Sequence, residues 1–136
     1  MNVLLVSDSA TLADQCARAL AKTAEFAVIP FPRTAEPADD FKDRDLVIVD
    51  VREARAPGLS LISRLRAGLP LSSLLAIGER FGVADDMAVA EAGGDGYLGF
   101  PFRDSELLAK IFLVTSITER ELRATAKSFR RGEGDS

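Results

Sequence analysis

The chain has 136 residues, of which 47% are hydrophobic and 28% charged, a composition that fits one globular domain and excludes a disordered chain. Its formal net charge of -4 argues against nucleic acid as the principal partner. Histidine is absent, which excludes histidine-based catalytic triads and histidine-bearing zinc sites.

Apolar runs alternate with helical patterns, which is typical of βαβ units and a parallel sheet. A first strand is predicted at residues 2–6, and a helix capped by a hydroxyl residue follows over residues 9–23 or 11–23. Cys16, the only cysteine, shares the apolar face of this helix, so we expect a buried structural thiol and a reducing compartment. A second strand is predicted at residues 26–30, where nearby prolines suit a sheet edge.

The middle of the chain continues this alternation. Residues 37–43 predict a short or partly irregular helix, because few of their side chains can pack inward. A third strand, at residues 46–51, is too short for a helix and rich in β-branched residues, so we expect it to be buried on both faces. A helix over residues 58–67 and a fourth strand at residues 74–77 follow.

The last part predicts a helix over residues 83–92, a fifth strand at residues 96–99 and an unusually long final helix. This helix begins at Asp104 or Ser105 and continues to Arg131, which gives about 40 Å at 1.5 Å per residue and overhangs the sheet. Its overhang either pairs with another helix or frays. Pairing is favoured by residues at heptad spacing, namely Leu108, Thr115, Leu122 and Phe129.

Two of the predicted strands end close to an aspartate, Asp8 in one case and Asp50 in the other. Parallel strands bring their carboxyl ends to one edge of the sheet, where open α/β folds place their binding sites. We therefore expect both carboxylates at one site.

The chain resembles the receiver domain of bacterial response regulators over about residues 2–118. The resemblance rests on five βα units, the strand that ends in Asp50, Gly58 eight residues later, and the segment from Gly94 to Phe102. It implies an α/β fold of the flavodoxin-like, CheY-like kind. Such a fold is a doubly wound five-stranded parallel sheet with strand order 2-1-3-4-5 and five helices, of which the last is extended here.

The resemblance also implies a phosphoacceptor site. In that family an aspartate at the position of Asp50 accepts a phosphoryl group from a histidine kinase, and a pair of acids after strand one holds Mg²⁺. Here the pair reads Ser7 and Asp8, so one carboxylate is missing. By analogy Asp8, Asp50 and the backbone carbonyl of Arg52 would bind Mg²⁺ weakly or not at all, and no other cofactor is expected.

Other positions depart from the family pattern. Gly78 stands where a threonine or serine hydrogen-bonds the phosphoryl group, and Phe100 replaces a lysine, whereas Tyr97 matches the aromatic switch and Pro101 the proline after a cis peptide. Phosphoryl transfer depends on cations that neutralise the developing charge. These losses predict a pseudo-receiver; the alternative is a working phosphoacceptor at Asp50.

Two arginines near the strand ends leave two interpretations open. If the guanidinium of Arg52 or Arg80 folds back, it pairs with Asp8 or Asp50, replaces the lysine or the metal, and locks the pocket. Otherwise both arginines are solvated loop charges.

The first functional hypothesis is a signalling module that acts through protein contacts. Its partner would be a second copy, an output domain or a histidine kinase, reached through a face that includes Tyr97, Phe100 and Phe102; alternatively, Phe100 only fills the space of the lysine. A small α/β enzyme or nucleotide-binding protein is the rival class. The glycine-rich residues 93–96 leave a helix and enter a strand, opposite to a phosphate loop, so no enzyme is predicted.

The predicted organisation has three parts. Residues 1–118 form the receiver-like domain, residues 119–131 extend its last helix as a linker or dimerisation helix, and residues 132–136 are a disordered tail. The basic side chains of residues 120–131 suit a helix C-terminus better than a nucleic-acid contact. No apolar run approaches the ~20 residues that cross a bilayer, so we expect a cytoplasmic protein without a membrane partner.

Overall fold

The computed structural model describes residues 1–31, 41–52, 58–69, 72–80 and 85–116. They form a five-stranded parallel sheet with strand order β2-β1-β3-β4-β5, which confirms the predicted fold class. The strands are β1 (Asn2–Val6), β2 (Glu25–Ile29), β3 (Leu46–Asp50), β4 (Ser73–Glu79) and β5 (Gly96–Phe100). The helices are α1 (Ala10–Leu20), α2 (Gly58–Gly68), α3 (Asp85–Ala92) and the stretch 104–116, called the C-terminal helix below.

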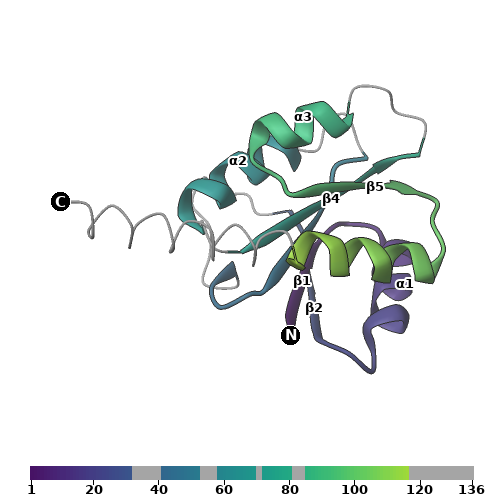
Figure 1. The fold of residues 1–136 in the computed structure, drawn as a ribbon. Coiled ribbons are helices and arrows are strands. Elements are labelled where there is room, and N and C mark those ends of the chain that lie inside the picture. Colours follow the sequence, from purple (N-terminus) through teal and green to yellow (C-terminus); the bar gives the residue numbers. More distant parts are fainter. Residues whose placement is uncertain (32–40, 53–57, 70–71, 81–84, 117–136) are drawn as a thin grey trace, which may run out of the picture.

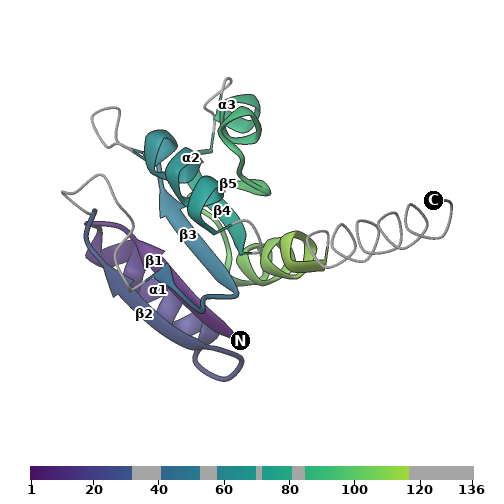
Figure 2. The ribbon, with the colours of Figure 1, turned by 90° about the vertical axis from the view of Figure 1, so that its left-hand side faces the viewer.

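Helices cover both faces of the sheet (Figures 1 and 2). α1 and the C-terminal helix lie on one face, and α2 and α3 lie on the other. Alternate side chains of β1 and β3 enter two separate apolar clusters, one beneath each pair of helices. All of β3 is buried, as a central parallel strand requires.

Several predicted boundaries need correction. The first helix ends at Leu20, not at residue 23, because the amides of Thr23 and Ala24 turn back to the carbonyl of Leu20. β4 is longer than predicted because it continues to Glu79, where β5 still pairs with it.

Some predictions fall outside the described residues. Most of the predicted helix over residues 37–43 does so, although Phe41 is fully buried beneath α2 and α3. So do the continuation of the last helix beyond residue 116 and the tail. Within the described part of the chain, no helix has the length and apolarity needed to cross a membrane.

A polar network fastens the sheet at the amino ends of β4 and β5. Arg66 of α2 donates to the carbonyls of Gly93 and Ser72 and pairs with Asp95 at 2.7 Å. Asp95 in turn accepts a hydrogen bond from the amide of Leu74. This network lies at the edge opposite to Asp50 and has a structural role.

At the surface, Arg18 of α1 pairs with Asp104 at the start of the C-terminal helix. Its Nε lies 3.4 Å from Oδ2 of Asp104, and the two side chains are 68% and 42% exposed. A pair so exposed contributes little to stability, which makes Arg18 a useful control position below.

Cys16 is fully buried on the inner face of α1, as predicted. Burial, with the nearby charges of Asp104 and Asp50, raises the pKa of its thiol to about 12. The thiolate that reacts with disulfide reagents is therefore scarce at neutral pH. We predict that Ellman's reagent leaves the native protein unlabelled and labels one thiol per chain in urea; rapid labelling of the native protein would contradict the buried placement.

Candidate functional site

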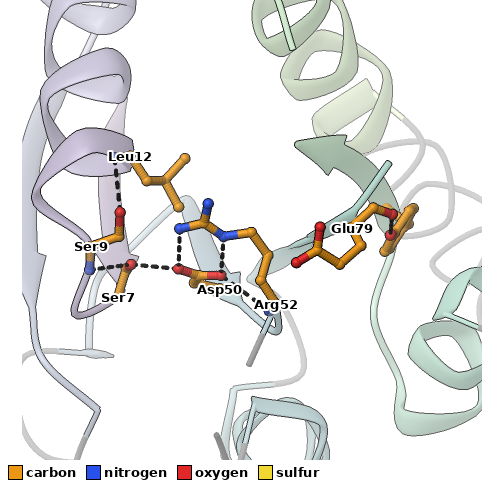
Figure 3. Close-up of polar contacts among 7 residues, drawn as sticks. Ser7, Ser9, Leu12, Asp50, Arg52 and Glu79 are labelled. Carbon is orange, nitrogen blue, oxygen red and sulfur yellow. Dashed lines mark hydrogen bonds and ion pairs between the residues drawn. The ribbon is translucent and has the colours of Figure 1, made fainter. Parts of the chain in front are cut away.

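Ser7 and Asp50 meet at the carboxyl edge of the sheet. β1 and β3 are parallel neighbours in a register that pairs Val6 with Val49, so the residues that follow are adjacent. The Ser7 hydroxyl donates to Oδ2 of Asp50 at 2.6 Å and itself accepts from the amide of Ser9 at 3.0 Å (Figure 3). Both Ser7 and Asp50 are buried.

Ser7, and not Asp8, supplies the hydrogen bond to Asp50. Asp8, the next residue, is exposed, and the expectation that its carboxylate shares a site with Asp50 stays a prediction. Serine contributes a donor rather than a negative charge, so the strand end holds one buried carboxylate with a hydrogen-bonding partner.

The Arg52 side chain folds back over Asp50 and donates hydrogen bonds to both of its carboxylate oxygens (Figure 3). Its Nε donates to Oδ1 and its Nη2 to Oδ2, each at 2.9 Å, and its backbone amide also donates to Oδ1 at 3.2 Å. The Arg52 and Asp50 side chains are only 17% and 9% exposed. The interpretation of Arg52 as a solvated loop charge is therefore wrong, and the fork geometry of a bidentate guanidinium pair is present.

Phe100 supports the guanidinium from β5. The Cζ atom of Arg52 lies 4.3 Å from the centroid of the Phe100 ring, a cation–π contact. Phe100 packs edge to face against Phe102 at 5.7 Å. We call Ser7, Asp50, Arg52 and Phe100 the Asp50 pocket.

Phe102 does not belong to an exposed partner face as expected, whereas Pro101 is exposed. Phe102 is buried, only 7% exposed, in the core beneath α1 and the C-terminal helix, because it anchors the chain between β5 and that helix. It is therefore unavailable to a partner. Pro101 is exposed and follows a cis peptide bond with Phe100, as the resemblance predicted.

Asp50 is held in its ionised form. Burial raises the pKa of the Asp50 carboxyl, but hydrogen bonds from Arg52 and Ser7 and the charge of Arg52 outweigh burial, so the pKa lies below its ordinary value of 3.8. The pocket is thus a closed arrangement of one negative and one positive charge.

The residues of this pocket do not fit a Mg²⁺ ion. Both carboxylate oxygens of Asp50 already accept hydrogen bonds from a cation or a hydroxyl. Among the described residues, no group of three or more acidic, cysteine or histidine side chains is arranged to hold a metal. Mg²⁺ prefers several oxygen ligands that can face it together.

Gly78 on β4 has Tyr97 packed over it. A Cβ atom built at Gly78 would lie 2.5 Å from the Tyr97 hydroxyl oxygen and 2.7 Å from ring atom Cζ. The Tyr97 hydroxyl donates to the backbone carbonyl of Glu79 at the end of the same strand. The ring therefore occupies the space that a threonine or serine side chain at position 78 would need.

Arg80 lies away from Asp50. It is exposed, its Nη1 donates to the carbonyl of Pro101 at 3.0 Å, and its backbone amide donates to the carbonyl of Phe100. Gly99 permits this approach, because a Cβ there would lie 2.6 Å from the Arg80 Cα. The pairing of Arg80 with an aspartate is not observed, and the role of Gly99 was not visible in the sequence because it depends on the β4–β5 register.

Comparison with known proteins shows that the chain is similar to response regulators. No protein family model matches it. It is 30% identical over 112 residues to the transcriptional regulatory protein TcrA of Mycobacterium tuberculosis, covering 82% of this chain and 44% of that protein. It is 35% identical over 74 residues to the response regulator PmrA of Pseudomonas aeruginosa, covering 54% of this chain and 34% of that protein. The chain thus spans less than half of these relatives.

Solved structures show the same fold. NtrX from Brucella abortus matches with a TM-score of 0.78 and 19% identity over 99% of this chain and 30% of that chain. A response regulator from Thermotoga maritima matches with a TM-score of 0.68 and 27% identity over 85% of this chain and 97% of that chain. A CheY-like receiver domain protein from Methanospirillum hungatei matches with a TM-score of 0.72 and 20% identity over 88% of this chain and 97% of that chain.

The sheet order, and an aspartate at the carboxyl end of the central strand, define the CheY-like receiver fold. The chain therefore has the receiver fold and is similar in sequence to response regulators, which confirms the predicted resemblance.

Proposed function

We propose that this receiver domain is a pseudo-receiver, which passes signals through protein–protein contacts without standard phosphorylation of Asp50. The observation that carries the proposal is the bidentate grip of Arg52 on both Asp50 oxygens, completed by the Ser7 hydroxyl. An oxygen held in this way must lose a charge-assisted hydrogen bond before it can attack phosphorus. The donor set also lacks the second carboxylate that would recruit Mg²⁺.

The switch position supports the same proposal. Tyr97 already lies over Gly78 and is hydrogen-bonded to the Glu79 carbonyl, with no hydroxyl at position 78 to relay a phosphate. Packing over Gly78 and the hydrogen bond to the Glu79 carbonyl therefore hold the Tyr97 ring in place without a phosphate. In this proposal the conformation of the domain is set by its sequence, not by phosphorylation.

We propose that the C-terminal helix provides the surface that contacts other proteins. Three large apolar side chains of this helix are exposed in the described structure: Leu108, Phe112 and Leu113, at 38%, 74% and 45%. Leu108 and Phe112 are four residues apart and are therefore neighbours on one side of the helix. The proposed partner is a second copy, an output domain or a histidine kinase, and no cofactor is required.

A phosphodonor experiment tests the proposal. Intact mass spectrometry after incubation with Mg²⁺ and phosphoramidate should show no gain of a phosphoryl group on the native chain, because Arg52 occupies the carboxylate. A receiver domain known to accept phosphate serves as the positive control for the donor. Mass gain on the native chain that is lost in Asp50→Asn would overturn the proposal.

That outcome would favour a second candidate, a slow phosphoacceptor in a two-component phosphorelay. One observation favours this candidate. Asp50 is ionised, and the Arg52 guanidinium beside it supplies the positive charge that a lysine at position 100 would otherwise supply. The same mass measurement decides between the two candidates.

A further inference from the structure

We propose that Arg52 is a built-in counterion that takes the place of a divalent cation beside Asp50, and that Phe100 is the positioning residue that keeps it there. The inference rests on the proposed pseudo-receiver function for its biological meaning. Its physical content, that a guanidinium excludes a metal ion, is tested separately from phosphorylation.

The Asp50 pocket carries its own compensating charge. The Asp50 carboxylate is buried, so it needs a compensating positive charge at short range. A receiver that binds Mg²⁺ obtains this charge from solution, whereas here it arrives on the same chain, two residues after the carboxylate. Both oxygens lie 2.9 Å from guanidinium nitrogens, so a divalent ion would have to displace the arginine to reach them.

Two groups hold the Arg52 guanidinium in place, the Asp50 carboxylate and the Phe100 ring. An arginine head has a planar face and an edge of N–H donors, and the pocket uses both. The edge binds Asp50, while Phe100 lies against the guanidinium with its centroid 4.3 Å from Cζ. The Phe100 ring is backed by the buried Phe102 ring, which fixes its orientation.

The uncharged Phe100 suits an arginine at position 52. Leu98 and Phe100 alternate along β5 so that both pack on the face beneath α1 and the C-terminal helix, toward which Ile48 of β3 also points. A lysine at position 100 would bring a second cation close to the Arg52 guanidinium and repel it. Phe100, which carries no charge, is therefore compatible with Arg52 as the counterion in a way that a lysine at position 100 would not be.

The experiment measures the response of thermal stability to about 10 mM MgCl₂ and the affinity for Mn²⁺ by titration calorimetry. The native protein should show no shift in Tm. Arg52→Met removes the charge but keeps a long side chain, and its Tm should rise by about 3 °C with Mg²⁺, with Mn²⁺ affinity about tenfold above that of the native protein. Adding Asp50→Asn to this variant should abolish both responses.

Three further variants separate the roles. Arg52→Lys keeps a cation and should remain unresponsive to Mg²⁺, whereas Phe100→Leu keeps Arg52 but removes its support and should respond in part. Arg18→Met, which removes the exposed pair with Asp104, is the matched control and should stay unresponsive.

The inference fails if Mg²⁺ stabilises the native protein as much as Arg52→Met, or if folded Arg52→Met does not respond. Should Arg52→Met unfold without metal, folding induced by Mg²⁺ supports the inference, and no response in it or in Phe100→Leu overturns it. These results do not depend on whether Asp50 accepts phosphate.

Discussion

Replacing Gly78 by threonine should drive the Tyr97 ring from its inward position and lower the free energy of unfolding by about 2–3 kcal/mol. The new Cβ would stand 2.5 Å from the Tyr97 hydroxyl oxygen, so side chain and ring cannot keep their places together. The hydrogen bond from Tyr97 to the Glu79 carbonyl would be lost as the ring moves.

The sequence itself supplies the probe for this change. Tyr97 is the only tyrosine, and the chain has no tryptophan, so the tyrosine band of the near-ultraviolet circular dichroism spectrum and the quenching of tyrosine fluorescence report on this one ring. Gly78→Thr should increase the quenching by acrylamide, and urea denaturation should measure the stability change.

A double variant provides the control. Tyr97→Leu removes the ring, so Gly78→Thr on that background should cost much less than it does alone, a coupling expected only of side chains in contact. Equal costs in the two backgrounds would show that the Tyr97 ring does not occupy the space above Gly78.

Replacing Arg52 by methionine should lower the free energy of unfolding by about 3 kcal/mol at neutral pH, because it leaves a buried carboxylate without its counterion. The Ser7 hydroxyl would remain as a partner, but it carries no charge. Urea denaturation monitored by far-ultraviolet circular dichroism measures the difference.

The loss should shrink as the pH falls. The folded pKa of Asp50 lies below its ordinary value of 3.8, so its pairing stabilises the fold above that value and is lost as the pH falls through the folded pKa. In Arg52→Met, burial raises the Asp50 pKa and the group is neutral in acid. The native protein and the variant should therefore differ much less at about pH 3 than at about pH 7.

Arg18→Met is again the control, because its pair with Asp104 is exposed; it should leave the urea midpoint essentially unchanged. Arg52→Lys should fall between the native protein and Arg52→Met, since it keeps the charge but not the fork. A pH-independent loss in Arg52→Met would indicate lost packing instead of a lost counterion.

The contrast between Arg52 and Arg80 shows where prediction from the sequence stopped. Both arginines follow strands at the same edge, and either could have faced solvent or Asp50. The structure places Arg52 on Asp50 and directs Arg80 to the Pro101 carbonyl. The rotamers of a long side chain differ little in energy, so the one adopted depends on partners that are distant in the sequence, such as Phe100.

The contacts of Ser7 and the burial of Phe102 also could not be predicted from the sequence. The sequence identified the site edge but assigned the second carboxylate to Asp8, whereas the residue before it points at Asp50. Phe102 was expected on a contact face and is instead buried beneath the C-terminal helix. In both cases the outcome depends on how the chain turns after a strand ends, where periodicity no longer applies.

The sequence by itself determined the parallel α/β fold, the order of its elements and the position of Asp50, because hydrophobic periodicity and strand length depend on neighbours along the chain. It also identified the departures at Ser7, Gly78 and Phe100. Only the tertiary structure decided that Arg52 closes over Asp50, that Phe100 holds it and that Tyr97 fills the space above Gly78. Those contacts join separate strands, and their geometry exists only once the sheet has set the register between them.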